Sequence, residues 1–184
     1  LSFNRSDDLT VAVAISGSGT LTQLGTGILT LAGPNTYTGN TTVGAGTLVL
    51  AEGAGLGFVV TDGGSTQILG TGALTLNGAF AIDTSTVTVE SGSWTLVDTT
   101  TLATTVGASF SLAGGEWSET AGVWKKTDGT RNWTFTEATG VLAIAGADYA
   151  GWIAGFDFSA FPGADLSPAG DADGDGIANA VELV

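Results

Sequence analysis

The sequence predicts an all-β protein whose main part is a β-solenoid (β-helix), a ladder of short strands stacked coil upon coil. Three observations favour this fold. Glycine makes up 30 of the 184 residues, only 12% of the residues are charged, and a Gly-x-Gly motif recurs along the first half of the chain. After each copy, apolar residues alternate with Thr or Val, which is typical of a pleated strand with one buried face.

The glycine motif begins four clear repeats and one looser repeat. The clear copies are residues 17–22, 25–31, 44–50 and 70–76, and the looser copy is residues 90–96. Glycine permits the positive φ that a tight corner needs. The alternation places six leucines on one face: Leu29, Leu31, Leu48, Leu50, Leu74 and Leu76. One such strand cannot bury this face alone, but coils stacked about 4.8 Å apart can. A β-sandwich with glycine-rich turns is the alternative.

Residues 110–147 are expected to form a short antiparallel meander that closes one end of the solenoid. The strand candidates are residues 110–112, 116–119, 123–126, 132–136 and 141–145, and Asp128-Gly129 is a strong hairpin signal. Trp117, Trp124 and Trp133 recur on successive strands, so their rings could stack on one face. Such a cap would cover the strand edges that a terminal coil exposes.

The last part of the chain differs in charge. Residues 148–184 contain seven acidic residues and no basic residue, whereas the whole chain has 18 acidic and four basic residues. We therefore divide the chain into solenoid repeats (1–109), the meander (110–147) and a small tail (148–184). A short helix over residues 148–156 would present four apolar side chains on one face: Tyr149, Trp152, Ile153 and Phe156.

Residues 171–182 match the twelve-residue calcium loop at every liganding position. The predicted ligands, in loop order, are Asp171, Asp173, Asp175, the carbonyl of Ile177, Asn179 and Glu182. Oxygen ligands with a bidentate glutamate suit calcium better than magnesium, so we predict calcium as the bound ion and a structural clamp as its role. An acidic surface turn without an ion is the alternative.

Residues 25–50 resemble the autotransporter-associated β-strand repeat. They contain a glycine-led strand, an Asn-x-Tyr-x-Gly-x-Thr turn over residues 35–41 and a second glycine-led strand from Gly44 to Leu50. The resemblance implies a right-handed β-helical protein that is secreted or carried on a bacterial cell surface, often with an adhesive or scaffold role. The tail, residues 149–182, is similar to the dockerin-like calcium tails of large secreted bacterial proteins.

The composition excludes several function classes. The net charge of −14 is incompatible with binding to nucleic-acid phosphates and unfavourable for docking on anionic lipid. Without Cys or His there is no zinc site, thiol nucleophile or Ser-His dyad. Residues 9–51 carry no charge, but they are rich in Thr, Gly, Ser and Asn, so we expect no membrane insertion. The chain begins with Leu1 and contains no Met, so we expect a processed or internal piece without a retained signal peptide.

These observations predict a non-enzymatic, extracellular or cell-surface structural protein. Residues 9–15 alternate as a strand with no obvious cap before them. We expect this strand to pair with a neighbouring copy, which would give a head-to-tail homo-oligomer or filament, as in a surface fibre, layer or adhesin. Calcium would stabilise this protein.

Two other functions remain as alternatives. A carbohydrate-binding or adhesive module would stack its tryptophans on surface glycans. A β-helix polysaccharide-degrading enzyme is less favoured, because such an enzyme needs a carboxylate pair or a well-placed base. The carboxylates considered are Asp7, Asp8, Glu116 and Glu119, and none of them is a convincing catalytic group. We therefore assign no catalytic residue.

Overall fold

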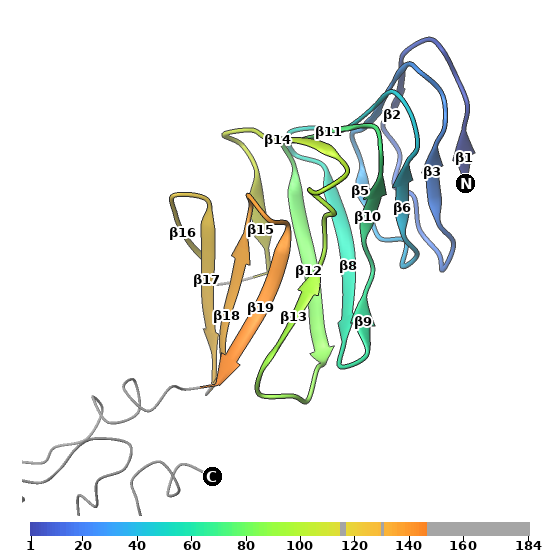
Figure 1. The fold of residues 1–184 in the computed structure, drawn as a ribbon. Coiled ribbons are helices and arrows are strands. Elements are labelled where there is room, and N and C mark those ends of the chain that lie inside the picture. The colour runs from blue at the N-terminus through green and yellow to red at the C-terminus, as the bar shows by residue number, and fades with distance from the viewer. Residues whose placement is uncertain (115–116, 130, 147–184) are drawn as a thin grey trace, which may run out of the picture. The chain divides into compact units, whose positions relative to one another are not determined.

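The computed structural model describes residues 1–114, 117–129 and 131–146, and these residues form strands and loops without any helix. Residues 1–144 belong to one compact unit. The chain passes through three parallel sheets in turn, and successive circuits add further strands to these sheets (Figure 1). This all-β arrangement of parallel sheets is consistent with a solenoid and differs from the antiparallel sheets of a sandwich. Within the described ranges, no helix is long and apolar enough to cross a membrane.

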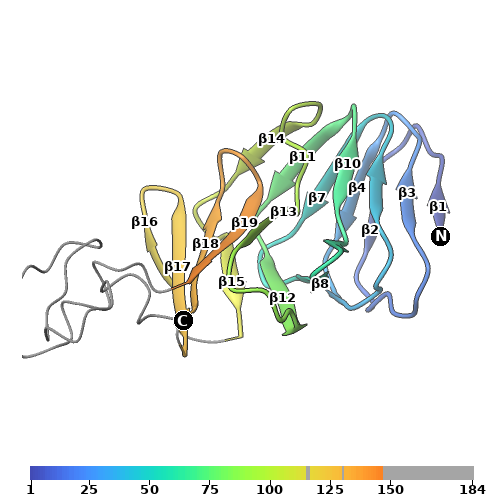
Figure 2. The ribbon, with the colours of Figure 1, turned by 60° about the horizontal axis from the view of Figure 1, so that its bottom comes forward.

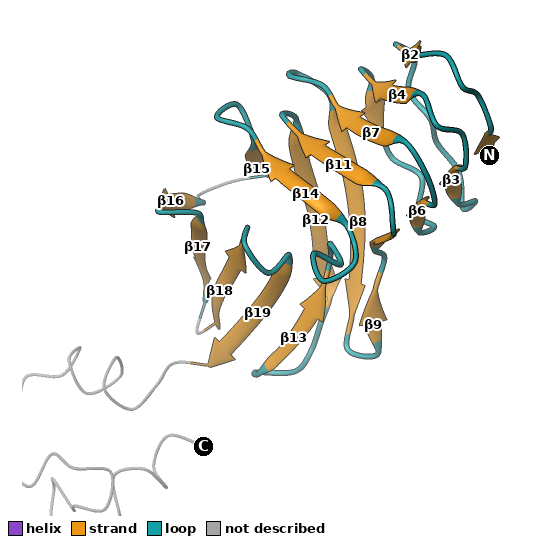
Figure 3. Cartoon of the chain, turned by 45° about the horizontal axis from the view of Figure 1, so that its top comes forward, coloured by secondary structure: helices purple, strands orange, loops and turns teal. Residues whose placement is uncertain are grey.

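Every neighbouring pair in the strand orders of these three sheets is parallel, and Figure 3 shows the strands of sheet B side by side. Sheet A has the order β1 (Ser2–Phe3), β3 (Leu21–Gln23), β6 (Thr41–Val43) and β10 (Ile68–Gly70). Sheet B has the order β14 (Ala103–Val106), β11 (Ala73–Leu76), β7 (Thr47–Leu50), β4 (Ile28–Leu31) and β2 (Leu9–Val11). Sheet C has the order β15 (Ser111–Ala113), β12 (Ala79–Thr86), β8 (Gly55–Thr61) and β5 (Pro34–Asn35), and β9 (Gly64–Ser65) pairs with β8 in the antiparallel sense.

The six leucines predicted to share one face form two ladders inside the coils. In one ladder Leu29, Leu48 and Leu74 pair in register, and Leu31, Leu50 and Leu76 form the other. Their side chains are at most 2% exposed, which confirms this part of the prediction. Burial of each such side chain contributes roughly 1.5–3 kcal/mol.

The circuits lengthen along the chain. Paired residues of sheet B are 20 positions apart between the first two circuits, as in Leu9 and Leu29. They are 30 apart between the last two circuits, as in Leu74 and Thr104. The motif copies at residues 17–22 and 25–31 supply β3 and β4, which are consecutive strands of a single circuit. The spacing of eight residues therefore separates two corners of one coil rather than two coils.

A fourth sheet, sheet D, lies beside the last circuit and takes strands from before and after it in the chain (Figure 2). Its order is β13 (Gly92–Thr95), β19 (Val141–Gly146), β18 (Arg131–Thr136), β17 (Val123–Asp128) and β16 (Ser118–Thr120). β13 pairs antiparallel with β19, although the looser repeat copy at residues 90–96 suggested a solenoid strand. Conversely, the first expected strand of the meander is β15, which pairs parallel with β12 in sheet C. Alternation predicts a strand but does not identify its partner, so the sequence could not separate these cases.

The three tryptophans expected to stack on one face, Trp117, Trp124 and Trp133, each contact a different group instead. Trp133 is 1% exposed and stacks on Trp94, with ring centroids 5.9 Å apart. The Trp124 ring meets Phe110 edge-on at 5.9 Å, and the Trp117 ring lies beneath the Nζ of Lys126. They therefore belong in part to the core that continues from the solenoid into sheet D.

Three expectations concern residues outside the described ranges. These are the helix over residues 148–156, the calcium loop over residues 171–182 and the tail domain that contains both. They stay predictions.

Glycines at the corners allow neighbouring coils to approach closely, and some of them also adopt a positive φ. A Cβ built on Gly25 would lie 1.9 Å from the carbonyl oxygen of Arg5, and one on Gly27 would lie 2.4 Å from that of Asp7. Neither glycine has a positive φ, so the expected reason for glycine is wrong at these two corners. Gly46 combines both requirements, because its φ is +60° and its Cβ would lie 2.4 Å from the Gly27 carbonyl oxygen.

Substitution at Gly46 tests this packing. Gly46→Ala should lower the free energy of unfolding by more than about 4 kcal/mol, because both the φ and the contact with the neighbouring backbone oppose a methyl group. Gly53→Ala is the matched control, since Gly53 has a φ of +76° and open space around its Cβ. The control should cost roughly 1–2 kcal/mol. Equal losses in urea denaturation of the two variants would contradict the role assigned to close approach.

Candidate functional site

The first circuit of the solenoid is covered on only one side by the described chain. Its inward side chains are Phe3, Leu9, Val11 and Ile15, and each is half-buried. The residues that follow them one circuit later are at most 2% exposed: Gln23, Leu29, Leu31 and Asn35. The first circuit thus presents an incompletely covered apolar core.

The backbone of the first circuit is hydrogen-bonded to the second circuit on one side only, as far as the described residues show. The carbonyl oxygens of Leu1, Phe3 and Val11 accept hydrogen bonds from the second circuit. Because peptide groups alternate in direction along a strand, those of the intervening Ser2 and Thr10 point the other way. β1 and β2 are edge strands, each with one partner among the described residues. Such an edge is a template for a further strand.

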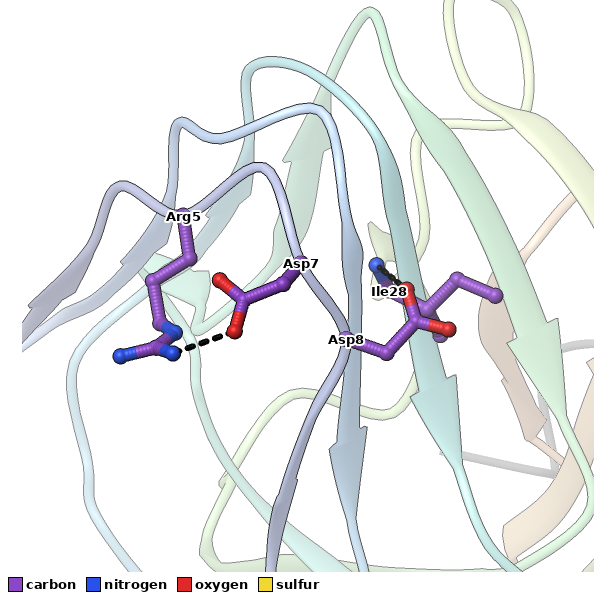
Figure 4. Close-up of polar contacts among 4 residues, drawn as sticks. All are labelled: Arg5, Asp7, Asp8 and Ile28. Atoms are coloured by element: carbon purple, nitrogen blue, oxygen red, sulfur yellow. Dashed lines mark hydrogen bonds and ion pairs between the residues drawn. The ribbon is translucent and has the colours of Figure 1, made fainter.

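Charged side chains gather at the corner between β1 and β2 (Figure 4). The Arg5 guanidinium donates a hydrogen bond to the Asp7 carboxylate, and both side chains are exposed. This hydrogen bond lowers the pKa of Asp7 below its ordinary value. Asp8 faces the second circuit, where its Oδ1 accepts the N–H of Ile28 at 2.9 Å. These contacts hold the corner between β1 and β2 in place.

Buried polar side chains hold two other corners of the second circuit. The Gln23 amide donates to the carbonyl oxygens of Gly25 and Gly27, each at 3.0 Å. The hydroxyls of Tyr37 and Thr41 are hydrogen-bonded to each other at 2.6 Å, and burial raises the pKa of Tyr37. Both contacts replace water as partners of groups that the coil encloses.

Asn35 connects three successive circuits. Its Oδ1 accepts the N–H of Ile15 in the first circuit at 3.2 Å. Its Nδ2 donates to Gly33 of its own circuit at 2.8 Å and to Gly55 of the next at 3.0 Å. The sequence held a signal for this role, because Asn35 stands where the alternation of inward and outward residues calls for an apolar side chain.

The other predicted sites are the calcium loop and the tryptophans expected to stack on glycans, and the described residues include only the tryptophans. All six predicted calcium ligands, Asp171, Asp173, Asp175, Ile177, Asn179 and Glu182, lie outside the described ranges. Among the described residues, no three His, Cys, Asp or Glu side chains are grouped so that they could hold a metal ion. Trp133 is too deeply buried to stack on a glycan, whereas Trp117 and Trp124 are half-buried.

Residues 21–50 match the passenger-associated-transport-repeat family. The match covers about one sixth of the chain, from the start of β3 to the end of β7, and includes the buried Gln23, Asn35 and Tyr37. It supports the autotransporter-associated resemblance of this repeat and agrees with a secreted or cell-surface bacterial protein. Comparisons with curated proteins and with solved structures give no match.

Removal of the Asn35 amide should loosen the first circuit. Asn35→Ala leaves the part-buried N–H of Ile15 without its acceptor and removes the hydrogen bonds donated to the carbonyl oxygens of Gly33 and Gly55. The free energy of unfolding should therefore fall by about 1–3 kcal/mol. Amide hydrogen exchange at Ile15 should become faster. The control is Asn40→Ala, because Asn40 is exposed and accepts a single hydrogen bond from the Gln67 N–H. Unchanged exchange at Ile15 would contradict the linking role.

Proposed function

We propose that this chain is a non-enzymatic structural module of an extracellular or cell-surface bacterial protein, and that it associates with other copies through its first circuit. The observation that carries the proposal is the half-covered first circuit, with its edge strands β1 and β2. The passenger-associated repeat supports a surface location. The fold is proposed to be right-handed, in keeping with the strong preference of parallel crossover connections for that hand.

The contact is proposed to be head-to-tail. The first circuit of one copy would pair with the opposite end of the next copy, where β14, β15 and β16 each have a single strand partner among the described residues. Such a contact joins two different surfaces, so the copies at the two ends of the assembly each keep one of these surfaces free. Further copies can therefore add at both ends, which would build a fibre or layer. A contact between two first circuits would instead stop at a dimer.

Blocking the edge of β2 should prevent association. Thr10→Pro removes an N–H that faces away from the second circuit, so the coil should tolerate it. Thr10→Ala is the matched control, because it keeps that N–H. In sedimentation velocity, the unaltered chain and Thr10→Ala should show an average mass that rises with concentration beyond a dimer, while Thr10→Pro should stay monomeric. A monomer in all three samples would disprove self-association, and an exclusive dimer would disprove the head-to-tail contact.

We also propose that residues 171–182 bind calcium as a structural clamp. The support is the chemistry of the sequence alone: three aspartates, an asparagine and a terminal glutamate at the liganding positions of a calcium loop. The net charge of −14 adds to this, because divalent ions would reduce repulsion between copies.

Calcium binding can be tested in the complete chain. Glu182→Gln removes the bidentate ligand and should weaken calcium binding in isothermal titration by more than about tenfold, or about 1.4 kcal/mol. Asp165→Asn changes an acidic residue of the same tail outside the loop and should leave the affinity unchanged. Equal affinities in both variants, or no calcium binding by the unaltered chain, would contradict the assignment.

A further inference from the structure

A groove runs along the seam between the last circuit of the solenoid and sheet D. It consists of three neighbouring hollows of about 470, 480 and 510 Å³. The first two share Val106 and Glu137 in their walls, and the first and third share Thr99 and Ala138. The three hollows therefore adjoin one another, and together we call them the seam groove.

Two carboxylates and a tryptophan line one part of the seam groove. Trp124 donates its Nε1 hydrogen to Glu137 Oε1 at 2.7 Å. Glu119, which pairs with Trp124 across β16 and β17, accepts the N–H of Gly122 through Oε1 at 2.7 Å. One oxygen of each carboxylate is therefore fixed by the cap, while the other has no hydrogen-bond donor among the described residues. The two groups are held in place before any ligand arrives.

The opposite wall supplies hydroxyl and peptide groups. The N–H groups of Ala103 and Gly107 face β11, where they donate to carbonyl oxygens of Gly72 and Leu76. The peptide groups of Thr104 and Val106 therefore face away from β11, and both residues line the groove. β14 has no second strand partner in the described part of the chain. This wall offers donors and acceptors at short intervals.

The acidic residues that line the seam groove limit the class of ligand that it can bind. The described lining residues include Asp98, Glu119 and Glu137 but no Lys or Arg. An anionic ligand would be repelled, whereas the hydroxyl groups of an uncharged sugar can donate to the free carboxylate oxygens. The half-buried Trp124 adds an aromatic surface against which the C–H groups of a sugar ring can pack. A sugar can therefore use the carboxylate oxygens and the Trp124 ring at the same time.

We propose that the seam groove binds an uncharged glycan chain. This binding site goes beyond the proposed self-association, but it includes β14, which the head-to-tail contact would also use, so glycan binding and association would compete. A positively charged extended peptide, which would add a strand to β14, is the competing occupant. Such a peptide would form backbone hydrogen bonds with β14 and ion pairs with the carboxylates, but it would not use the Trp124 ring.

The test uses the Thr10→Pro variant, in which association is expected to be blocked. It is titrated with uncharged cello-, xylo-, laminari- and malto-oligosaccharides, with polygalacturonate and with an oligolysine peptide. Isothermal titration should detect at least one uncharged probe with a dissociation constant between about 10 μM and 1 mM. Glu137→Gln and Trp124→Phe should each weaken that binding by about tenfold or more, because both change groups that contact the ligand.

Matched controls separate the groove from the rest of the cap. Trp117→Phe alters a half-buried tryptophan of the cap that does not line the hollows, and Glu90→Gln removes an exposed carboxylate elsewhere; both should bind as the parent does. The proposal is overturned if no uncharged probe binds up to about 10 mM, if Glu137→Gln and Trp124→Phe leave binding intact, or if only polygalacturonate or oligolysine binds. Because every sample carries Thr10→Pro, none of these outcomes depends on self-association.

Discussion

Each circuit of the chain must return to the strand laid down by the previous circuit and pair with it at a spacing of about 4.8 Å. At that distance, like positions of successive circuits stand directly above one another. Leucine therefore meets leucine in the ladders of sheet B, and the corners of neighbouring coils come into backbone contact. The same spacing accounts for the aliphatic interior and for glycine at Gly25 and Gly27. A side chain at either corner would have to push the coils apart and so break the pairing on all three sheets.

The sequence was sufficient to predict the strands of this ladder, but not every partner. Two-residue alternation identified the inward face from Leu29 to Leu76, because an error of one residue would expose every leucine. The looser repeat copy at residues 90–96 predicted a solenoid strand, whereas β13 within it pairs antiparallel with β19. Long-range pairing depends on which edges remain open after the earlier circuits have formed, and local alternation does not contain that information. The predicted calcium ligands rest on spacing alone, since they lie outside the described residues.

Polar residues inside the coils were the least predictable part of the candidate site. Asn35 and Gln23 break the apolar pattern, so composition alone would count them as defects of the core. Their amides instead donate to backbone carbonyl groups at the turns, and two of these, on Gly27 and Gly33, also accept a backbone N–H from the next circuit. A buried polar group is costly unless it is hydrogen-bonded, and each of these amides bonds to more than one backbone group. Both lie in the segment that matches the passenger-associated repeat, so this segment of the chain contains the amides that hold its turns as well as leucines of the ladder.

The charge distribution determines which forces could join two copies at the first circuit. The chain has only four basic residues, and one of them, Arg5, is engaged with Asp7 of its own corner. Ionic attraction between copies is thus weak, and the excess of carboxylates opposes contact at low salt. Association through this face would have to depend on strand pairing and on covering Phe3, Leu9 and Val11, both of which act over short distances. Raising the ionic strength should therefore favour association until repulsion is screened, after which only the apolar and backbone contacts would determine the affinity.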